Sequence, residues 1–274
     1  MGKKDFRLAL SLWAVLGMAA VFMAARAAVF FLNREYFGAL SGAEIISAFA
    51  NGLRFDFSVL ALFMGPVIFL LNLPVRARAW VKGWAAVLLA EGIFMTGFLI
   101  GDLIYFPKVN RHIAEEILQL SNDWGFILSY MLTQTWLPLA VLLAGFGAGV
   151  WALCRYTNRV YAPRQWRIKK TAALLLCLLV LILGGIRGHL GRGKTLGVAD
   201  VYNYASSPAA AALTLNGVFT AYQVGRKGRM DVANQYSAEQ AIKNAQQYLL
   251  AADETVPVEA YPLMRRAKAE QAAP

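Results

Sequence analysis

The sequence predicts an all-α integral membrane protein with five transmembrane helices. Apolar residues make up 58% of its 274 residues, whereas a soluble domain contains about 45–50%. These residues gather in five long runs that are separated by polar loops. Because the bilayer core offers no water to the backbone, each run must satisfy its hydrogen bonds internally, as a helix does. The alternation of apolar and polar residues that is typical of a membrane β-barrel does not occur in the sequence.

The five apolar runs set the boundaries of the expected spans. The first run follows a basic segment and is longer than the apolar region of a signal peptide, so we expect it to be retained. A proline directly after the second run and another after the third run mark their ends. The expected spans cover residues 8–32, 55–73, 84–106, 126–153 and 171–186 of a transmembrane domain, residues 1–190.

Lysine and arginine are distributed unequally between the two sides of these spans. The amino-terminal segment and the loops after the second and fourth runs carry twelve of them, whereas the other two loops carry four. Cytoplasmic loops are enriched in positive charge, so the amino terminus is expected in the cytoplasm and the tail, after five crossings, outside it. This placement explains the net charge of +11. Because no recognition motif accompanies that charge, we expect no nucleic-acid partner.

The carboxyl-terminal tail divides into an extracytoplasmic juxtamembrane segment with short helices, residues 191–252, and a linker, residues 253–274. We expect the first part of the juxtamembrane segment to lie against the outer membrane surface. In it, Ser207-Pro208 can start a helix and Asn216-Gly217 can end it. The capping-box pattern of Ser237-Ala238-Glu239-Gln240 predicts a further helix.

A phosphate-loop pattern, G-x-x-x-x-G-K-[ST], occurs over residues 188–195 and ends on Lys194 and Thr195. In a nucleotide site a buried strand precedes this loop and a helix follows it, so that backbone amides converge on the phosphates. Here an apolar span precedes the pattern. The context therefore favours a basic exit from the membrane over a nucleotide-dependent enzyme.

Two further polar features have both a functional and a structural interpretation. His112 and Glu116 are four residues apart, as helical metal ligands can be, but the chain has only two histidines, and an exposed polar helix face is the simpler interpretation. We therefore expect no metal site. Glu91 lies within the third span; together with Gln134 and Arg26 it would form an intramembrane polar path in a transporter.

Six residues are expected together at the outer membrane boundary, because they begin the second span, end the third or follow the fifth. Opposite charges at one depth can pair and shape a polar pocket that faces the outer leaflet, in which arginine would bind a lipid phosphate. The alternative is interfacial anchoring with structural ion pairs. The six residues are Arg54, Asp56, Asp102, Tyr105, Arg187 and Arg192.

Around these residues the chain resembles one protein family. The segments are Gly52-Leu53-Arg54-Phe55-Asp56-Phe57, Gly101-Asp102-Leu103-Ile104-Tyr105-Phe106, Leu213-Thr214-Leu215-Asn216-Gly217-Val218-Phe219 and Tyr261-Pro262-Leu263. In their order and spacing they resemble the lipoteichoic acid synthase-like phosphoglycerol transferases of the sulfatase superfamily, including their Gram-negative relatives. The resemblance extends over essentially the whole chain. The Asn216-Gly217 pair departs from the Asn-Pro expected in that family.

The resemblance implies a protein of the bacterial cytoplasmic membrane that acts in the cell envelope. In this family an extracytoplasmic sulfatase-like domain, with a threonine nucleophile and a divalent metal, typically manganese, transfers phosphoglycerol from phosphatidylglycerol. No residue of this chain matches the nucleophile or the metal ligands, so we assign it no catalytic residue and no cofactor of its own. We expect that domain beyond Pro274 or on a separate chain.

The function expected from the resemblance is therefore that of the membrane-anchoring half of a phosphoglycerol or related head-group transferase. This half would hold the sulfatase-like domain outside the membrane and contact membrane lipids, phosphatidylglycerol among them. The alternative is a stand-alone membrane module, a small transporter or an assembly partner, with no catalysis of its own.

Overall fold

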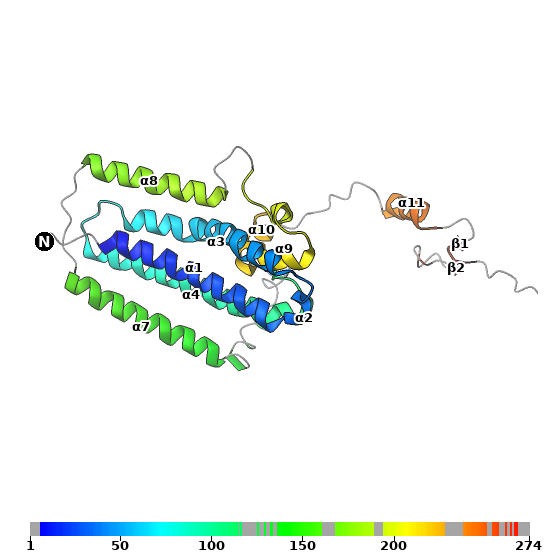
Figure 1. Cartoon of the computed structure of the whole chain (residues 1–274), viewed down its shortest axis with the longest axis horizontal. Helices are drawn as coiled ribbons and strands as arrows, with labels where there is room; N and C mark the ends of the chain where they lie inside the picture. Colours follow the sequence, from blue (N-terminus) through cyan, green and yellow to red (C-terminus); the bar gives the residue numbers. More distant parts are fainter. Residues whose placement is uncertain are drawn as a thin grey trace, which may run out of the picture. The chain divides into compact units, whose positions relative to one another are not determined.

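In the computed structural model, five helices are long and apolar enough to cross a membrane, and they run alongside one another (Figure 1). This confirms an all-α, multi-pass membrane architecture. The structure describes residues 6–114, 116, 125, 129, 132–133, 136–160, 168–188, 194–227, 238–250, 254–257, 261, 264 and 266–267. The long helices are α1 (Phe6–Leu32), α3 (Gly42–Leu71), α4 (Arg78–Val109), α7 (Trp136–Val160) and α8 (Ile168–Arg187); α2 (Arg34–Phe37) is a single turn.

Helix α3 begins at Gly42, well before the boundary at residue 55 that the apolar run predicts. A capping box starts it: the Ser41 side chain accepts a hydrogen bond from the Glu44 amide at 3.3 Å, and Glu44 accepts one from the Ser41 amide at 2.8 Å. Both bonds satisfy amides that have no partner within the helix. The helix then continues through Arg54 and Asp56 without a break.

Helix α4 is also longer than its apolar run. It begins at Arg78 rather than near residue 84, and Pro107 lies inside its last turn instead of after its end. The helix ends at Val109, and the next residue, Asn110, has a φ of 55°; asparagine tolerates this left-handed conformation and is common just beyond helix ends. For the fourth span, the expected residues 126–135 lie mostly outside the part of the chain that the structure describes.

Helices α1, α3 and α4 pack against one another, while α8 packs on α3 and α7 packs on α4. Small residues allow the outer helices to approach closely, as is common between helices in membranes. Gly65 of α3 lies against Ile182 of α8, and Gly185 of α8 lies against Ala61 of α3. On the other side Gly149 of α7 lies against a leucine side chain of α4.

We call α1, α3 and α4 the inner helices. They are aligned at one end of the bundle and are longer than α8. At the shared end, which we call the amino-terminal end, Arg7 of α1 donates hydrogen bonds of 2.9 Å to the carbonyls of Leu73 and Val75, which follow α3. Helix α8 has 20 residues, about 30 Å at 1.5 Å per residue, whereas α4 has 32, about 48 Å. At the opposite end of the bundle, α3 and α4 therefore extend beyond the end of α8.

Three short elements cover that opposite end: η1 (Val198–Asn203), α9 (Pro208–Thr214) and α10 (Gly217–Lys227). We call residues 194–227 the cap and the end of the bundle that they cover the capped end. Helix α9 packs on α3 and α1, and α10 packs on α4 and α3. The cap belongs to the same compact unit as the bundle, Met1–Lys227.

The second compact unit, Gly228–Pro274, contains α11 (Ala238–Leu249) and two short antiparallel strands, β1 (Glu254–Thr255) and β2 (Arg266–Ala267). Helix α11 lies where the capping-box pattern predicts a helix, although Ser237 itself is outside the described residues. The strands pair Glu254 with Ala267 within the segment expected to be a linker.

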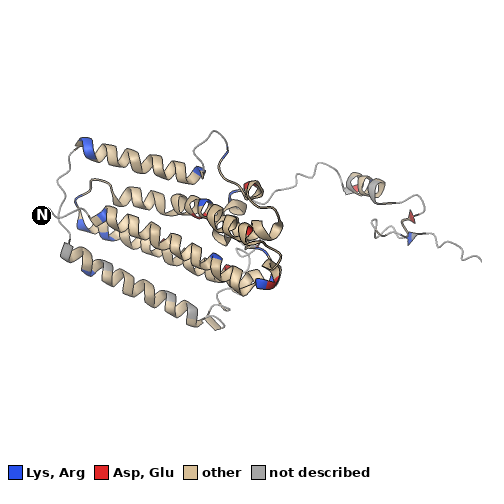
Figure 2. Ribbon diagram, viewed as in Figure 1, with Lys and Arg blue, Asp and Glu red and all other residues tan. Residues whose placement is uncertain are grey.

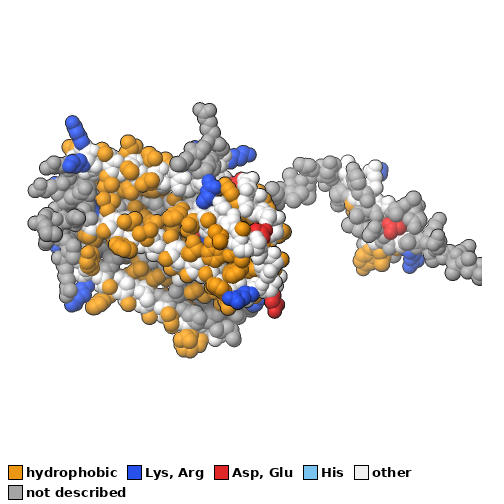
Figure 3. Space-filling view, in the orientation of Figure 1, with side chains coloured by type: hydrophobic (Ala, Val, Ile, Leu, Met, Phe, Trp, Pro, Cys, Tyr) orange, Lys and Arg blue, Asp and Glu red, His pale blue; other side chains and the backbone are white. Residues whose placement is uncertain are grey.

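The surface of the first unit has the distribution expected of a membrane protein. Apart from Glu91, which lies within α4, its charged side chains lie towards the two ends of the bundle (Figure 2). Apolar side chains cover the sides of the helices between these ends (Figure 3). They include Trp13, Phe94 and Trp151, which are exposed by 71%, 72% and 65%.

Candidate functional site: a buried ion cluster under the cap

At the capped end, an arginine and an aspartate from two spans form a buried ion pair. Arg26 of α1 donates from Nη1 and Nη2 to the two carboxylate oxygens of Asp56 of α3, both at 2.8 Å. Arg26 is 4% exposed and Asp56 is 0% exposed. Gly52, one turn before Asp56, makes room for the guanidinium, because a Cβ at that position would lie 2.6 Å from Nη2 of Arg26. The ion pair is therefore bidentate, and the backbone at Gly52 lies directly against the guanidinium.

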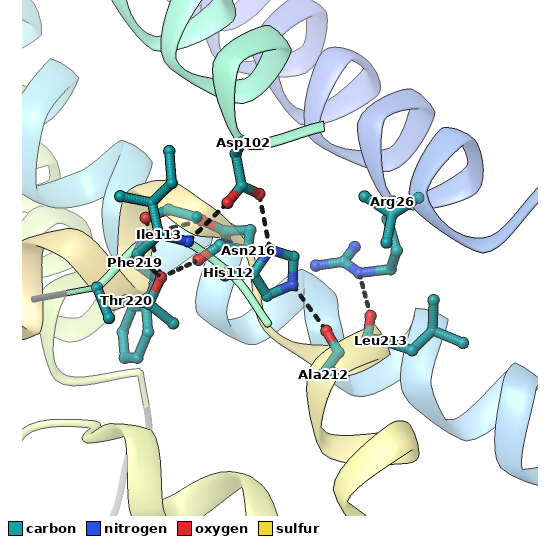
Figure 4. A network of polar contacts seen from close by, with 12 residues as sticks. Arg26, Asp102, His112, Ile113, Ala212, Leu213, Asn216, Phe219 and Thr220 are labelled. Carbon is teal, nitrogen blue, oxygen red and sulfur yellow. Dashed lines mark hydrogen bonds and ion pairs between the residues drawn. The ribbon is translucent and has the colours of Figure 1, made fainter. Parts of the chain in front are cut away.

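Arg26 also binds the carboxyl-terminal end of α9. Its Nε donates to the Leu213 carbonyl at 3.0 Å, and its Nη2 donates to the Thr214 carbonyl at 3.2 Å (Figure 4). The last carbonyls of a helix have no partner within the helix and form the negative end of its dipole, so a cation there is favourable. Arg26, a residue of the first span, thus binds the carboxyl-terminal end of α9, which lies almost two hundred residues later in the sequence.

A second pair lies beside the first and joins α4 to α9. Asp102 of α4 contacts His112 Nδ1 at 2.7 Å and accepts a hydrogen bond from the Ile113 amide at 2.8 Å. His112 Nε2 lies 2.8 Å from the Ala212 carbonyl of α9 (Figure 4). A carbonyl can only accept, so His112 Nε2 donates to it, and the Asp102 carboxylate lies against the other ring nitrogen. The imidazole therefore links α4 to α9.

Both pairs meet at the start of α10. The Asn216 side chain donates to Asp56 at 2.8 Å and accepts from the Phe219 amide at 2.8 Å, which makes it the amino-terminal cap of α10. Asn216-Gly217 therefore starts a helix instead of ending one. Gly217 lies directly against Asp102, since a Cβ on it would lie 2.5 and 2.6 Å from the carboxylate oxygens. The positive end of the α10 dipole is thus next to an acidic side chain.

We call Arg26, Asp56, Asp102, His112 and Asn216 the ion cluster. Its contacts match the dipoles of two helix termini: Arg26 and His112 bind carbonyls at the end of α9, and the Asp56 and Asp102 carboxylates lie at the start of α10. Thr220 of α10 adds a hydrogen bond of 2.7 Å to the Ile113 carbonyl. The cluster contains members from α1, α3, α4 and the cap, so it fixes the cap on the three inner helices.

Of the six residues expected at the outer boundary, the ion cluster contains two, Asp56 and Asp102. The cation that pairs with Asp56 is Arg26, because Arg54 instead donates to the Tyr204 hydroxyl and lies 5.0 Å from that ring's centroid. Tyr105 donates to Glu116 at 2.6 Å. Arg187 is exposed at the end of α8, and Arg192 lies outside the described residues.

The other polar features separate in the structure. His112 is buried in the ion cluster, whereas Glu116 binds Tyr105 and Arg111, so the two do not share a metal. In the described part of the chain, no group of three or more histidine, cysteine or acidic residues could hold a metal ion. The middle of the phosphate-loop pattern, residues 189–193, lies outside that part, and helix α8 precedes it where a nucleotide site needs a strand.

For the polar path, Glu91 has one carboxylate oxygen that is buried without a hydrogen-bond partner among the described residues. Arg26 is bound to Asp56 and to the end of α9, and Gln134 lies outside the described residues. A path through Arg26 would therefore require the ion cluster to open.

Sequence reasoning missed Arg26, His112 and Asn216 as members of the cluster. The sequence suggests an intramembrane polar path for Arg26 and an exposed helix face for His112. One available signal was charge inside an apolar run, which by itself indicates a buried partner or a functional role. Arg26 and Asn216 meet Asp56 from 30 and 160 residues away, and His112 meets Asp102 from 10 residues away, beyond the end of α4. Spacing along one helix gives no information on such pairs.

The Glu116 carboxylate provides a test of the geometry around Tyr105. Partial burial alone would raise its pKa, but hydrogen bonds from Tyr105 and from the Ala114 amide, together with the Arg111 charge, lower the pKa of Glu116 to about 2. Because the pKa is lowered on folding, the stabilisation is complete above the ordinary glutamate value of about 4.3 and is lost as the pH falls towards about 2. We expect the Tyr105→Phe change to raise this pKa.

Titration of glutamate carboxyls by NMR, with the Glu116→Gln variant to assign the signal, measures the effect. An unchanged pKa in Tyr105→Phe would contradict the hydrogen bond to Tyr105.

No protein-family model, no curated protein and no solved structure matches the chain.

Proposed function

We propose that the chain is the membrane-anchoring part of a head-group transferase of the bacterial cell envelope, similar to the lipoteichoic acid synthase-like phosphoglycerol transferases. Its role is to hold a sulfatase-like catalytic domain at the extracytoplasmic surface of the cytoplasmic membrane. The observation that carries this proposal is the ion cluster, which fixes the polypeptide after the fifth span to the bundle. The proposed role requires no metal held by this chain.

The orientation in this proposal rests on charge. At the amino-terminal end of the bundle, α4 starts with Arg78 and Lys82 and α8 starts with Lys169 and Lys170, and the described residues there include no acidic side chain. The capped end mixes both signs, with Glu35, Glu44 and Asp200 among its acids. Positive loops stay in the cytoplasm, so the capped end faces outward and a domain that follows the cap lies outside the cell.

The attachment of the cap to the bundle would restrict the movement of a domain that follows it. A tail that merely left the fifth span at Arg187 would leave a following domain free to move over a wide area. Instead, the segment from Ala210 to Gln223 is buried over most of its length, and Gln223 itself donates a hydrogen bond of 2.6 Å to the Leu196 carbonyl. The first compact unit ends only at Lys227, so a domain that follows the cap would be attached at a fixed position on the bundle.

Thiol labelling in intact cells tests the orientation. With Cys154 and Cys177 replaced by serine, we expect a cysteine at Asn244, an exposed residue of α11, to react with a reagent that cannot cross the membrane. The matched control is a cysteine at Ala77, an exposed residue in the turn between α3 and α4 at the amino-terminal end, which should react only after the cells are opened. Labelling in the reverse order would overturn the orientation and, with it, the proposed function.

Transfer activity tests the function itself. A sulfatase-like catalytic domain is produced with the chain, either joined to its carboxyl end or on a separate polypeptide, in cells whose phosphatidylglycerol carries labelled glycerol. We expect label to move to an acceptor in the envelope, and the joined form should transfer more. If the same catalytic domain is active on another membrane anchor but never with this chain, the proposal fails.

A further inference from the structure

A small hollow at the capped end lies apart from the ion cluster, at the junction of α3, α8 and α10. The hollow lies beside the end of α8, the shorter of the two spans compared above, so the position of that end gives its depth in the membrane. Ser58 of α3 donates to the Ile186 carbonyl at 3.0 Å, one residue before α8 ends at Arg187. Since α8 is about as long as the hydrocarbon core is thick, about 30 Å, its end marks the boundary between hydrocarbon and head groups.

The lining of the hollow is polar towards the cap and apolar towards the membrane core. Ser58, Thr195, Gln223 and Arg226 supply the polar side. Deeper along α3 the lining includes Leu62, and the neighbouring Phe63 ring is 37% exposed. Phe63 makes an edge-to-face contact with Tyr222 of α10, with ring centroids 6.0 Å apart. This order matches that of a phospholipid, with a phosphate above and an acyl chain below.

The polar side favours an anion. Arg226 is exposed at the mouth, and its Nη1 donates to the Thr195 hydroxyl at 2.9 Å. An arginine has five donors, so a planar fork remains for a phosphate, and the Thr195 hydroxyl can donate its own hydrogen. None of the ten lining residues is acidic. Two cations, Arg187 and Lys194, are the chain neighbours of the lining residues Ile186 and Thr195.

We infer that this hollow binds the phosphate of an anionic phospholipid from the surrounding leaflet. The enclosed part measures about 10 Å³, room for roughly one water molecule. The phosphate therefore sits at the mouth against Arg226 and Thr195, with one oxygen in the place of that water, while an acyl chain follows Leu62 and Phe63. Such a lipid would fill the junction between α8 and the cap. The inference is independent of the proposed function, because the hollow shares no residue with the ion cluster.

Lipid retention by the purified full chain tests the inference. The protein is extracted from bilayers that contain equal amounts of phosphatidylglycerol and phosphatidylcholine, and native mass spectrometry counts the bound lipids. We expect preferential retention of phosphatidylglycerol, which Arg226→Ala lowers about fivefold, the effect of removing one cation near a charged lipid surface. Thr195→Val, which keeps the charge, should also weaken it. Arg226→Lys should retain an intermediate amount because lysine cannot bind bidentately.

The matched control is Arg34→Ala. Arg34 is exposed at the same end and lies 5.0 Å from the Phe31 ring, away from the hollow, so its loss should leave retention unchanged. Equal retention by Arg226→Ala and the wild-type protein, or an equal loss in Arg34→Ala, would overturn the inference. Displacement of the lipid by excess inorganic phosphate would also overturn it, since the site would then bind a free anion.

Discussion

Replacing Asp56 with asparagine is expected to destabilise the protein by about 3–5 kcal/mol, the usual effect of removing one partner of a buried ion pair. The substitution keeps the side-chain shape but leaves Arg26, which is 4% exposed, without a counter-charge. It also turns one of the acceptors of Arg26 and Asn216 into a donor. Denaturant unfolding in detergent micelles, followed by circular dichroism, measures the loss.

The double variant Arg26→Met/Asp56→Leu separates the ion pair from the attachment of the cap. Replacing a buried pair by apolar residues is often neutral, so the bundle should recover most of its stability. The Leu213 and Thr214 carbonyls would still lack their donor, and we expect hydrogen exchange in α9 and α10 to stay fast. Exchange as slow as in the wild-type protein would show that Arg26 does not hold the cap. The control Arg34→Met should change stability by less than about 0.5 kcal/mol.

Replacing Gly217 with alanine is expected to cost about 1–3 kcal/mol, the range for forcing a methyl group into a packed interior. The new Cβ would lie 2.5 Å from the nearer oxygen of Asp102. That carboxylate cannot swing away cheaply, because His112 and the Ile113 amide hold its two oxygens. Either α10 or the Asp102 side chain must shift, and hydrogen exchange should rise in α10 before it rises in the spans.

Gly225 in the same helix is the matched control. A Cβ at Gly225 would meet nothing within 4 Å, so the Gly225→Ala change should be neutral or stabilise the helix by up to about 1 kcal/mol. Equal effects of the two substitutions would mean that Gly217 is not in close contact with Asp102. The start of α10 would then not belong beside the ion cluster.

The sequence was sufficient to predict the number of spans, because five apolar runs of helical length have no other solution in lipid. It was less informative about where α3 and α4 begin. Arg54 and Asp56 interrupt the apolar run that contains them, so the run suggested a loop up to Arg54 where the helix is in fact continuous from Gly42. The Ser41–Glu44 capping box was visible in the sequence, but a capping pattern does not reveal how far a helix continues.

For the site, residue type and depth were enough to select Asp56 and Asp102. Their partners were not accessible in the same way, because Arg26, His112 and Asn216 come from a span, a loop and the cap. The helix pattern that gives neighbours three and four residues apart does not extend to such separations. The Asn216-Gly217 pair was misassigned for a related reason: asparagine and glycine occur at both ends of helices, and only the contact with Asp56 identifies the start of α10.

The burial of the cap changes the reach of anything that follows it in the chain. If the tether began where α8 ends, at Arg187, the forty residues up to Lys227 would add to its length. A flexible chain of forty residues has a root-mean-square extent of about 35 Å. Because the cap is fixed, that slack is removed, and the local concentration of a tethered partner at the bilayer surface rises accordingly.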